Sequence, residues 1–190
     1  REIKDSFEVK LIKKACAVSD KGFEFISREI KEGITEKKLA WELEKFFRST
    51  GADDRAFKII VASGRQSAVP HHLTSTKKIK KGDVILIDAG VQYRGYCSDS
   101  TRMFALGPVS AKVKEIYEIV HKAQAAAINI AKTGKKASNV DMAARSIIKK
   151  AGYGNCFGHG TGHGVGIEIH EQPTVSFLNN KSVLKENSVI

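Results

Sequence analysis

Apolar residues recur at spacings of three and four along four stretches of the chain, the pattern of helices that bury one face. The stretches form two pairs, each a longer helix followed by a shorter one. Ser110 and Ser138 are predicted to cap two of these helices, and Ser138 with Asp141 matches a capping box. Glycines fit the helix C-termini, at Gly33, Gly51, Gly134 and Gly152.

The second helix pair repeats the first. When the first segment is shifted by 101 residues, its apolar positions align with those of the second. The aligned pairs are Leu39 with Val140, Trp41 with Met142, Phe46 with Ile147, Phe47 with Ile148, Ile12 with Val113 and Ile26 with Ala127. An internal repeat of this kind predicts two halves built alike.

Strand patterns follow each helix pair. We expect a strand over residues 57–62, a long hairpin over 83–104 that turns at Tyr93-Arg94-Gly95, and a strand-like run over 156–169. A second hairpin is predicted to begin near Val189 and to continue past residue 190. The fold class is therefore α+β, with two pseudo-symmetric helix-helix-hairpin halves, the second incomplete.

Composition removes several classes of protein. No run approaches the roughly 18 apolar residues that a membrane span needs. The net charge of +11 invites a nucleic-acid interface, but the lysines are spread over all the helical stretches, which favours a solvated surface. The three cysteines are far apart, which argues against disulfides or a zinc ribbon and predicts a reducing cytoplasm.

Both ends of the sequence have the pattern of cuts. The start is charged and carries neither an initiator methionine nor a signal peptide, and the end falls within an apolar run. We therefore expect residues 1–190 to be part of a longer protein.

Asp88 ends an apolar strand, and Asp99 lies on the predicted return strand. If Tyr93 and Arg94 form the turn, Asp88 lies directly opposite Asp99, with Cβ atoms about 4.5–5.5 Å apart. Like charges repel at that distance, and a divalent cation between them removes the cost. The alternative is that both aspartates are ordinary turn or cap residues.

Glycine occupies every second position from 158 to 166. A strand with this alternation has one bare face that another backbone or a ligand can approach closely. The other face carries His159, Thr161, His163 and Val165. Phosphate binding is the rival interpretation, but neither phosphate-loop nor dinucleotide spacing is present.

The remaining histidines are weaker candidates. His170 lies seven residues after His163 and could reach the same site only through a bend, and His71 lies 17 residues before Asp88. His121 lies within a predicted helix and is taken as structural.

Five segments together resemble the pita-bread metallopeptidases, most closely the Xaa-Pro aminopeptidases and prolidases. They are Pro70-His71, residues 86–90 (Leu-Ile-Asp-Ala-Gly), 98–102 (Ser-Asp-Ser-Thr-Arg), 162–166 (Gly-His-Gly-Val-Gly) and 170–173 (His-Glu-Gln-Pro). The resemblance covers essentially the whole chain. It implies a fold of two related halves, in agreement with the repeat.

The resemblance also implies a dinuclear metal site. Asp88, Asp99 and His163 match three of its five ligands, and two glutamates are expected past residue 190, so the fragment alone should be inactive. An oxygen-rich site of this kind suits two Mn²⁺ ions, with Co²⁺ or Zn²⁺ as substitutes. His71 and His170 are implied as catalytic residues that stabilise the tetrahedral intermediate, and His71 and His159 as substrate-binding residues.

The implied reaction is hydrolysis of the bond between an N-terminal residue and a following proline. The partners would be peptides with proline at the second position, without nucleic acid or membrane, and the full-length protein could form a homodimer. A methionine aminopeptidase, a creatine-cleaving hydrolase and a pita-bread module that only binds remain alternatives.

Overall fold

The computed structural model describes residues 2–190 and contains two compact units. One unit is Ser6–Val109, and the other joins the residues up to Asp5 with Ser110–Ile190. Within residues 2–190, no disulfide joins the three cysteines. No helix among these residues has the length and apolar content that crossing a bilayer demands.

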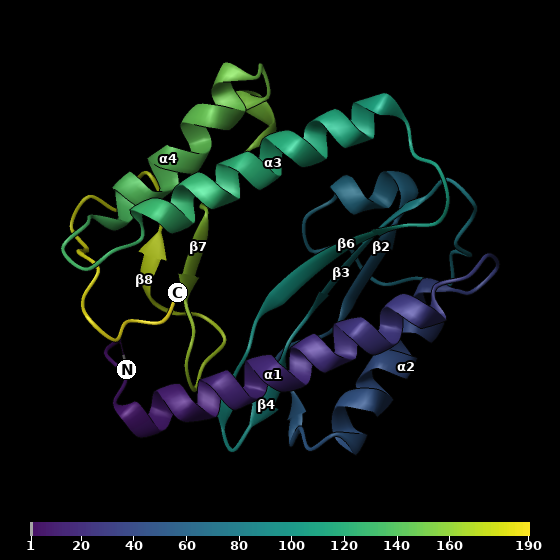
Figure 1. Ribbon diagram of the computed structural model, residues 1–190, viewed down its shortest axis with the longest axis horizontal. Coiled ribbons are helices and arrows are strands. Elements are labelled where there is room, and N and C mark those ends of the chain that lie inside the picture. Colours follow the sequence, from purple (N-terminus) through teal and green to yellow (C-terminus); the bar gives the residue numbers. More distant parts are fainter. Residues whose placement is uncertain (1) are drawn as a thin grey trace. The chain divides into compact units, whose positions relative to one another are not determined.

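The unit Ser6–Val109 packs two helices against antiparallel strands (Figure 1). Its elements are α1 (Ser6–Glu29), α2 (Glu36–Ser49), β1 (Asp54–Arg55), β2 (Ile60–Ser63), a 3-10 turn (Gly64–Ala68), β3 (Val84–Ala89), β4 (Val91–Tyr93), β5 (Tyr96–Cys97) and β6 (Ser100–Ala105). The strands form two sheets, ordered β2-β3-β6 and β1-β4-β5. Alternate residues of β3, Ile85 and Ile87, are buried with Leu39, Leu43 and Phe47 of α2 in one core.

The hairpin turns one residue later than the sequence analysis expected. Arg94 and Gly95 form the two-residue turn, with φ of 49° and 82°, and Tyr93 pairs with Tyr96. Two positive φ values in succession define the turn type that matches the twist of a hairpin. The second position of this turn favours glycine. The predicted direct pairing of Asp88 with Asp99 is therefore wrong, because Asp88 lies opposite Thr101.

The other unit contains α3 (Ala111–Ile130), α4 (Ala137–Lys150), a 3-10 turn (Gly154–Cys156), β7 (Gly162–Gly164) and β8 (Glu171–Val175). In Figure 1, α3 and α4 lie side by side and the short β7-β8 pair lies beneath α4. The core is small, and it is formed by Ala123, Ala127, Val140, Ala144, Ile148, Val175 and Leu184.

Two predictions fail in this second unit. The strand expected over 156–169 is limited to Gly162–Gly164, with a 3-10 turn before it and bends after it. Ser138 is not a cap, because α4 begins at Ala137 with Lys136 in the N-cap position. The cap predicted at Ser110 is confirmed, since its hydroxyl accepts a hydrogen bond from the Val113 amide at 3.3 Å.

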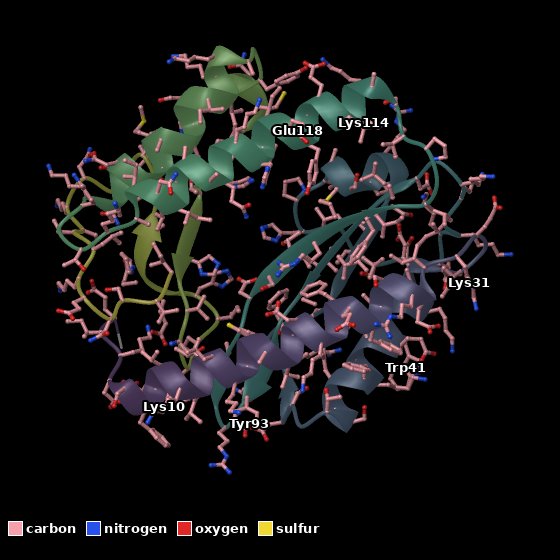
Figure 2. All side chains as sticks on the ribbon, in the orientation of Figure 1. Lys10, Lys31, Trp41, Tyr93, Lys114 and Glu118 are labelled. Atoms are coloured by element: carbon pink, nitrogen blue, oxygen red, sulfur yellow. The ribbon has the colours of Figure 1, made fainter. Side chains whose placement is uncertain are left out.

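The internal repeat is confirmed to the residue for the two short helices. Helices α2 and α4 are each 14 residues long, and their bounds differ by the predicted shift of 101. The turns before them repeat a hydrogen bond, from Gly33 N to Ile79 O at 2.9 Å and from Gly134 N to Leu184 O at 2.8 Å. Trp41, labelled in Figure 2, and its counterpart Met142 are both exposed, at 56% and 47%.

Candidate metal centre and active site

The two aspartates come from opposite arms of one hairpin, with Asp88 in β3 and Asp99 between β5 and β6. Asp88 lies in β3 and is half-buried, and the Thr101 hydroxyl of β6 donates to its Oδ1 at 2.8 Å. Asp99 is also half-buried, and the hydrogen bond from Ser98 N to Val91 O continues the register of the hairpin past it. Alternation in this register places Asp99 on the same side as Asp88. Diagonal neighbours of this kind are typically about 7–8 Å apart, with their Cβ atoms somewhat closer, which still suits bridging by metal ions.

Gly90 lets the hairpin close tightly between these aspartates. A Cβ atom at Gly90 would overlap the Ser98 carbonyl oxygen, so only glycine fits there. Ser98 is fixed in turn, because its amide donates to Val91 O at 2.9 Å and its buried hydroxyl lies 2.7 Å from the Ser19 hydroxyl of α1. The backbone on either side of Asp99 is thereby held in place.

His163 lies in β7, and its ring is oriented by its own backbone. The Nδ1 atom lies 3.0 Å from the Gly164 carbonyl oxygen. A proton on Nδ1 donates to that carbonyl, which fixes the tautomer in which Nε2 carries the lone pair that metal ions bind.

A bend after β7 brings His170 to His163, as the sequence analysis required. The two ring centroids are 4.3 Å apart at an interplanar angle of 57°. Next to His170, the Glu171 carboxylate pairs with Lys4 Nζ at 2.9 Å, and both side chains are almost fully buried. Burial raises the pKa of Glu171, but hydrogen bonds, among them those from Lys4 and the Glu168 amide, together outweigh burial and hold that pKa well below its usual range.

Two glycines of this segment, Gly160 and Gly164, have the role that was predicted for the bare face. A Cβ at Gly164 would overlap the Gln172 carbonyl, and a Cβ at Gly160 would lie 2.9 Å from the Val175 carbonyl oxygen. The backbone of the β8 region therefore packs directly against Gly160 and Gly164, whereas a Cβ at Gly158 or Gly162 would meet no atom within 4 Å.

A buried ion pair on α4 anchors the same segment. Asp141 is fully buried, and Arg145 binds both of its carboxylate oxygens, at 2.7 and 3.1 Å. The amide and hydroxyl of Thr161 donate to Asp141 Oδ1 at 3.0 and 2.8 Å. Arg145 also donates to the carbonyls of Phe157 at 2.8 Å and His159 at 2.7 Å.

His159 is exposed, with its backbone held by Arg145. Its Nδ1 lies 2.7 Å from the Gly160 carbonyl, and its ring meets Phe157 edge-on with centroids 5.0 Å apart. His71 is also exposed, and it has a positive φ of 55°, which is uncommon for a residue other than glycine. Both imidazoles are thus exposed at the surface, and Arg145 holds the backbone of His159.

Comparison with known proteins decides the family. The model of metallopeptidase family M24 matches residues 10–190. The chain belongs to metallopeptidase family M24. An Xaa-Pro dipeptidase of Pyrococcus furiosus is 45% identical over 190 residues. These residues are all of this chain and 54% of that protein.

Solved structures agree with this family. An X-Pro aminopeptidase from Thermotoga maritima matches with a TM-score of 0.96 and 45% identity, over 99% of this chain and 53% of that one. A prolidase from Pyrococcus furiosus gives the same TM-score and identity and is covered to 56%. The pita-bread fold is confirmed, and the M24 chain spans about half the length of the relatives it matches.

The donors suit the divalent metal ions on which an M24 metallopeptidase depends. Carboxylate oxygens and a neutral imidazole nitrogen are ligands for such ions. Thr101 and the Gly164 carbonyl orient two of them, as outer partners of metal ligands commonly do. Among the described residues 2–190, neither unit by itself contains three His, Cys, Asp or Glu side chains that converge into a metal-binding cluster.

The sequence analysis did not identify two buried acidic residues, Asp141 and Glu36, that support the segments carrying the candidate site residues. Asp141 and Arg145 lie four residues apart on one helix, and that spacing is the signal that could have identified the pair. Glu36 follows a threonine cap and has the pattern of an ordinary first-turn acid. Nothing local to Glu36 indicates that its carboxylate is buried, since that depends on residues 27 to 39 positions away.

Proposed function

We propose that the full-chain protein is a dinuclear metallo-exopeptidase that releases an N-terminal residue from a following proline, using Mn²⁺ in preference to Co²⁺ or Zn²⁺. The observation that carries the proposal is the set of Asp88, Asp99 and His163, with both the hairpin and β7 orienting these donors. Relatives named Xaa-Pro dipeptidase and prolidase support the choice of substrate.

Each described residue has a role in this proposal. Asp88, Asp99 and His163 would hold the ions, which when bound polarise the scissile carbonyl and supply a water that ionises near neutral pH. His71 and His170 stabilise the tetrahedral intermediate, and His71 and His159 orient the peptide in the substrate groove. An imidazole can donate a hydrogen bond to a developing oxyanion at physiological pH.

Two further ligands, both glutamates, are expected after residue 190. We therefore propose that residues 1–190 form part of the catalytic domain and that a 190-residue fragment has no activity by itself. We also infer a cytoplasmic enzyme without a nucleic-acid partner, on the grounds of the separated cysteines and the dispersed lysines. The homodimer remains a prediction.

The proposal is tested with three peptides. The full-chain protein is stripped of metal with a chelator, reloaded with Mn²⁺, Co²⁺ or Zn²⁺ in parallel, and assayed on Arg-Pro-Pro, Gly-Pro and Met-Ala-Ser. We expect metal-dependent cleavage before proline, fastest with Mn²⁺. Preference for Arg-Pro-Pro identifies an aminopeptidase, and preference for Gly-Pro a dipeptidase.

Two results would contradict it. Cleavage of Met-Ala-Ser alone would indicate a methionine aminopeptidase with the same metal chemistry. No cleavage of any peptide, together with no bound metal, would indicate a module that only binds.

The roles of two histidines are tested in the same assay. His71→Ala and His170→Ala are expected to lower kcat of the full-chain enzyme by roughly 10- to 1000-fold while metal content stays unchanged, because neither imidazole is assigned to a metal. Metal content is measured by elemental analysis. An unchanged kcat in both variants would remove these two residues from the mechanism.

A further inference from the structure

One fully buried carboxylate holds the segment that carries His71. Glu36 is the first residue of α2 and has 0% of its surface exposed. The amide and hydroxyl of Ser63 donate to its Oε1 at 2.9 and 2.7 Å. The amide and hydroxyl of Ser75 donate to its Oε2 at 3.1 and 2.7 Å, and His72 Nε2 lies 3.1 Å from the same oxygen.

These donors lie at the two ends of the segment 63–75 and beside its exposed tip. Ser63 ends β2 and Ser75 closes the segment, while His72 directly follows His71. Two further hydrogen bonds hold the part of the segment that follows His71. The Thr74 hydroxyl donates to Ile59 O at 3.1 Å and accepts from the Val61 amide at 2.9 Å. The segment is thus fastened to α2 and to β2 on either side of His71.

The backbone of His71 requires such support. A residue other than glycine at φ 55° persists only where the surroundings determine its conformation several times over. The side chain of His71 is exposed and cannot fix that conformation by packing. The next residue along the chain, His72, is hydrogen-bonded to the Glu36 carboxylate, and this bond restrains the backbone beside His71.

Electrostatics keeps Glu36 in the form that accepts all these hydrogen bonds. Burial raises the pKa of its carboxyl, but hydrogen bonds from Ser75, Ser63 and His72 outweigh burial and lower the pKa below its usual value. Lys77 adds positive charge next to the cluster, since its Nζ lies 2.5 Å from the Ser63 hydroxyl and 3.1 Å from Asp83 Oδ2. A charged carboxylate has only acceptor sites, which suits a ring of donors.

We propose that Glu36 is a positioning residue for the peptidase reaction, which acts by clamping the segment 63–75 so that His71 is presented in its active conformation. The inference rests on the proposed function, because it assigns Glu36 an effect that passes through His71. Glu36 itself is buried beneath the segment and touches neither substrate nor metal in this assignment.

The kinetic test is a double-mutant cycle in the full-chain enzyme. Glu36→Gln keeps the side-chain size but turns one acceptor oxygen into a donor that faces other donors. We expect kcat/KM to fall by roughly 10- to 100-fold, because small displacements of a catalytic group have effects of that size. In a His71→Ala background the same change should lower kcat/KM by less than about 3-fold, because residues that act through one another are not additive.

The controls separate positioning from general loss of structure. Glu42→Gln alters a glutamate on the same helix that pairs with the exposed Lys38 and Lys45, and it should leave kcat/KM within about 2-fold. Ser75→Ala removes one hydrogen bond to Glu36, together with the one that its hydroxyl accepts from the Lys77 amide, and preserves the carboxylate. It should therefore give a smaller fall in the same direction if Glu36→Gln does not fold. Equal losses from Glu36→Gln with and without His71 would overturn the proposal.

A readout without activity keeps this proposal distinct from the proposed function. In metal-free full-chain protein labelled at histidine, the Cα and Cβ chemical shifts of His71 report its positive φ. Glu36→Gln should shift the signals of His71 and His72 and leave those of His121, in α3, unchanged. If the wild type cleaves no peptide, the shifts still test the clamp, and unchanged His71 signals in Glu36→Gln would overturn it.

Discussion

Asp88→Asn is expected to remove nearly all peptidase activity from the full-chain enzyme, together with part of its metal. Asp88 Oδ1 accepts a hydrogen bond from the Thr101 hydroxyl at 2.8 Å, and this bond orients the carboxylate that is proposed to bind metal. An amide carries no charge to balance a divalent ion, so both affinity and polarisation fall. Metal-bound transition states are stabilised by several kcal/mol, which corresponds to at least about a 1000-fold loss in kcat.

The measurement combines kcat with metal content per chain. Asp20→Asn is the matched control, because Asp20 forms an exposed ion pair with Arg102, at 3.2 Å. It should alter kcat by less than about 2-fold, since exposed pairs contribute little. If Asp88→Asn kept its full metal content, Asp88 would not be a ligand, whatever its effect on rate.

The elements that follow local patterns were predictable from the sequence. The repeat placed α2 and α4 in equivalent positions because Leu39 and Val140 are buried while Trp41 and Met142 are exposed. The glycines at 51 and 152 have positive φ directly after those helices. Helix periodicity and helix termination are encoded within a few residues, so a single sequence contains both.

The hairpin register shows how one local choice propagates. Moving the turn from Tyr93-Arg94 to Arg94-Gly95 shifts every pair by two positions and replaces Asp99 with Thr101 opposite Asp88. The glycine at 95 was the available signal, because positive φ at the second turn position favours it. The shared face of the two aspartates survives the change, since a shift of two preserves strand alternation.

The supporting network was beyond sequence reasoning for a different reason. Glu36 and Asp141 are acids in amphipathic helices, and such acids are usually solvated. Their burial depends on donors such as Ser75 and Thr161, which the fold brings from distant positions. Pattern methods therefore identified the candidate ligands, whose spacing is unusual, but not the residues that hold them.

Asp141→Asn is expected to destabilise the full-chain protein by about 3–5 kcal/mol at pH 7, because it removes the charged partner of Arg145 in a buried ion pair. Arg145 would retain its charge with 16% of its side chain exposed and no carboxylate to bind it. Thr161 would lose a charged acceptor for its amide and hydroxyl. Urea denaturation measures the loss, and hydrogen exchange should show faster opening of residues 157–164.

An exposed pair again supplies the control. Glu24→Gln removes the partner of Arg28 in an ion pair whose side chains are both largely exposed, and it should cost less than about 1 kcal/mol. A loss of similar size in Asp141→Asn would show that the buried pair contributes no more than a surface one.

The pH dependence of this loss distinguishes charge from shape. Burial raises the pKa of Asp141, but hydrogen bonds from Arg145 and Thr161 outweigh it, so the folded-state pKa lies below the unfolded value of about 3.9. The unfolded chain therefore binds the proton first as pH falls. The stabilisation is complete above about pH 4 and is lost as pH falls through the folded-state pKa. The difference in unfolding free energy between wild type and Asp141→Asn should shrink across that range, and a difference that stays constant would assign the loss to packing.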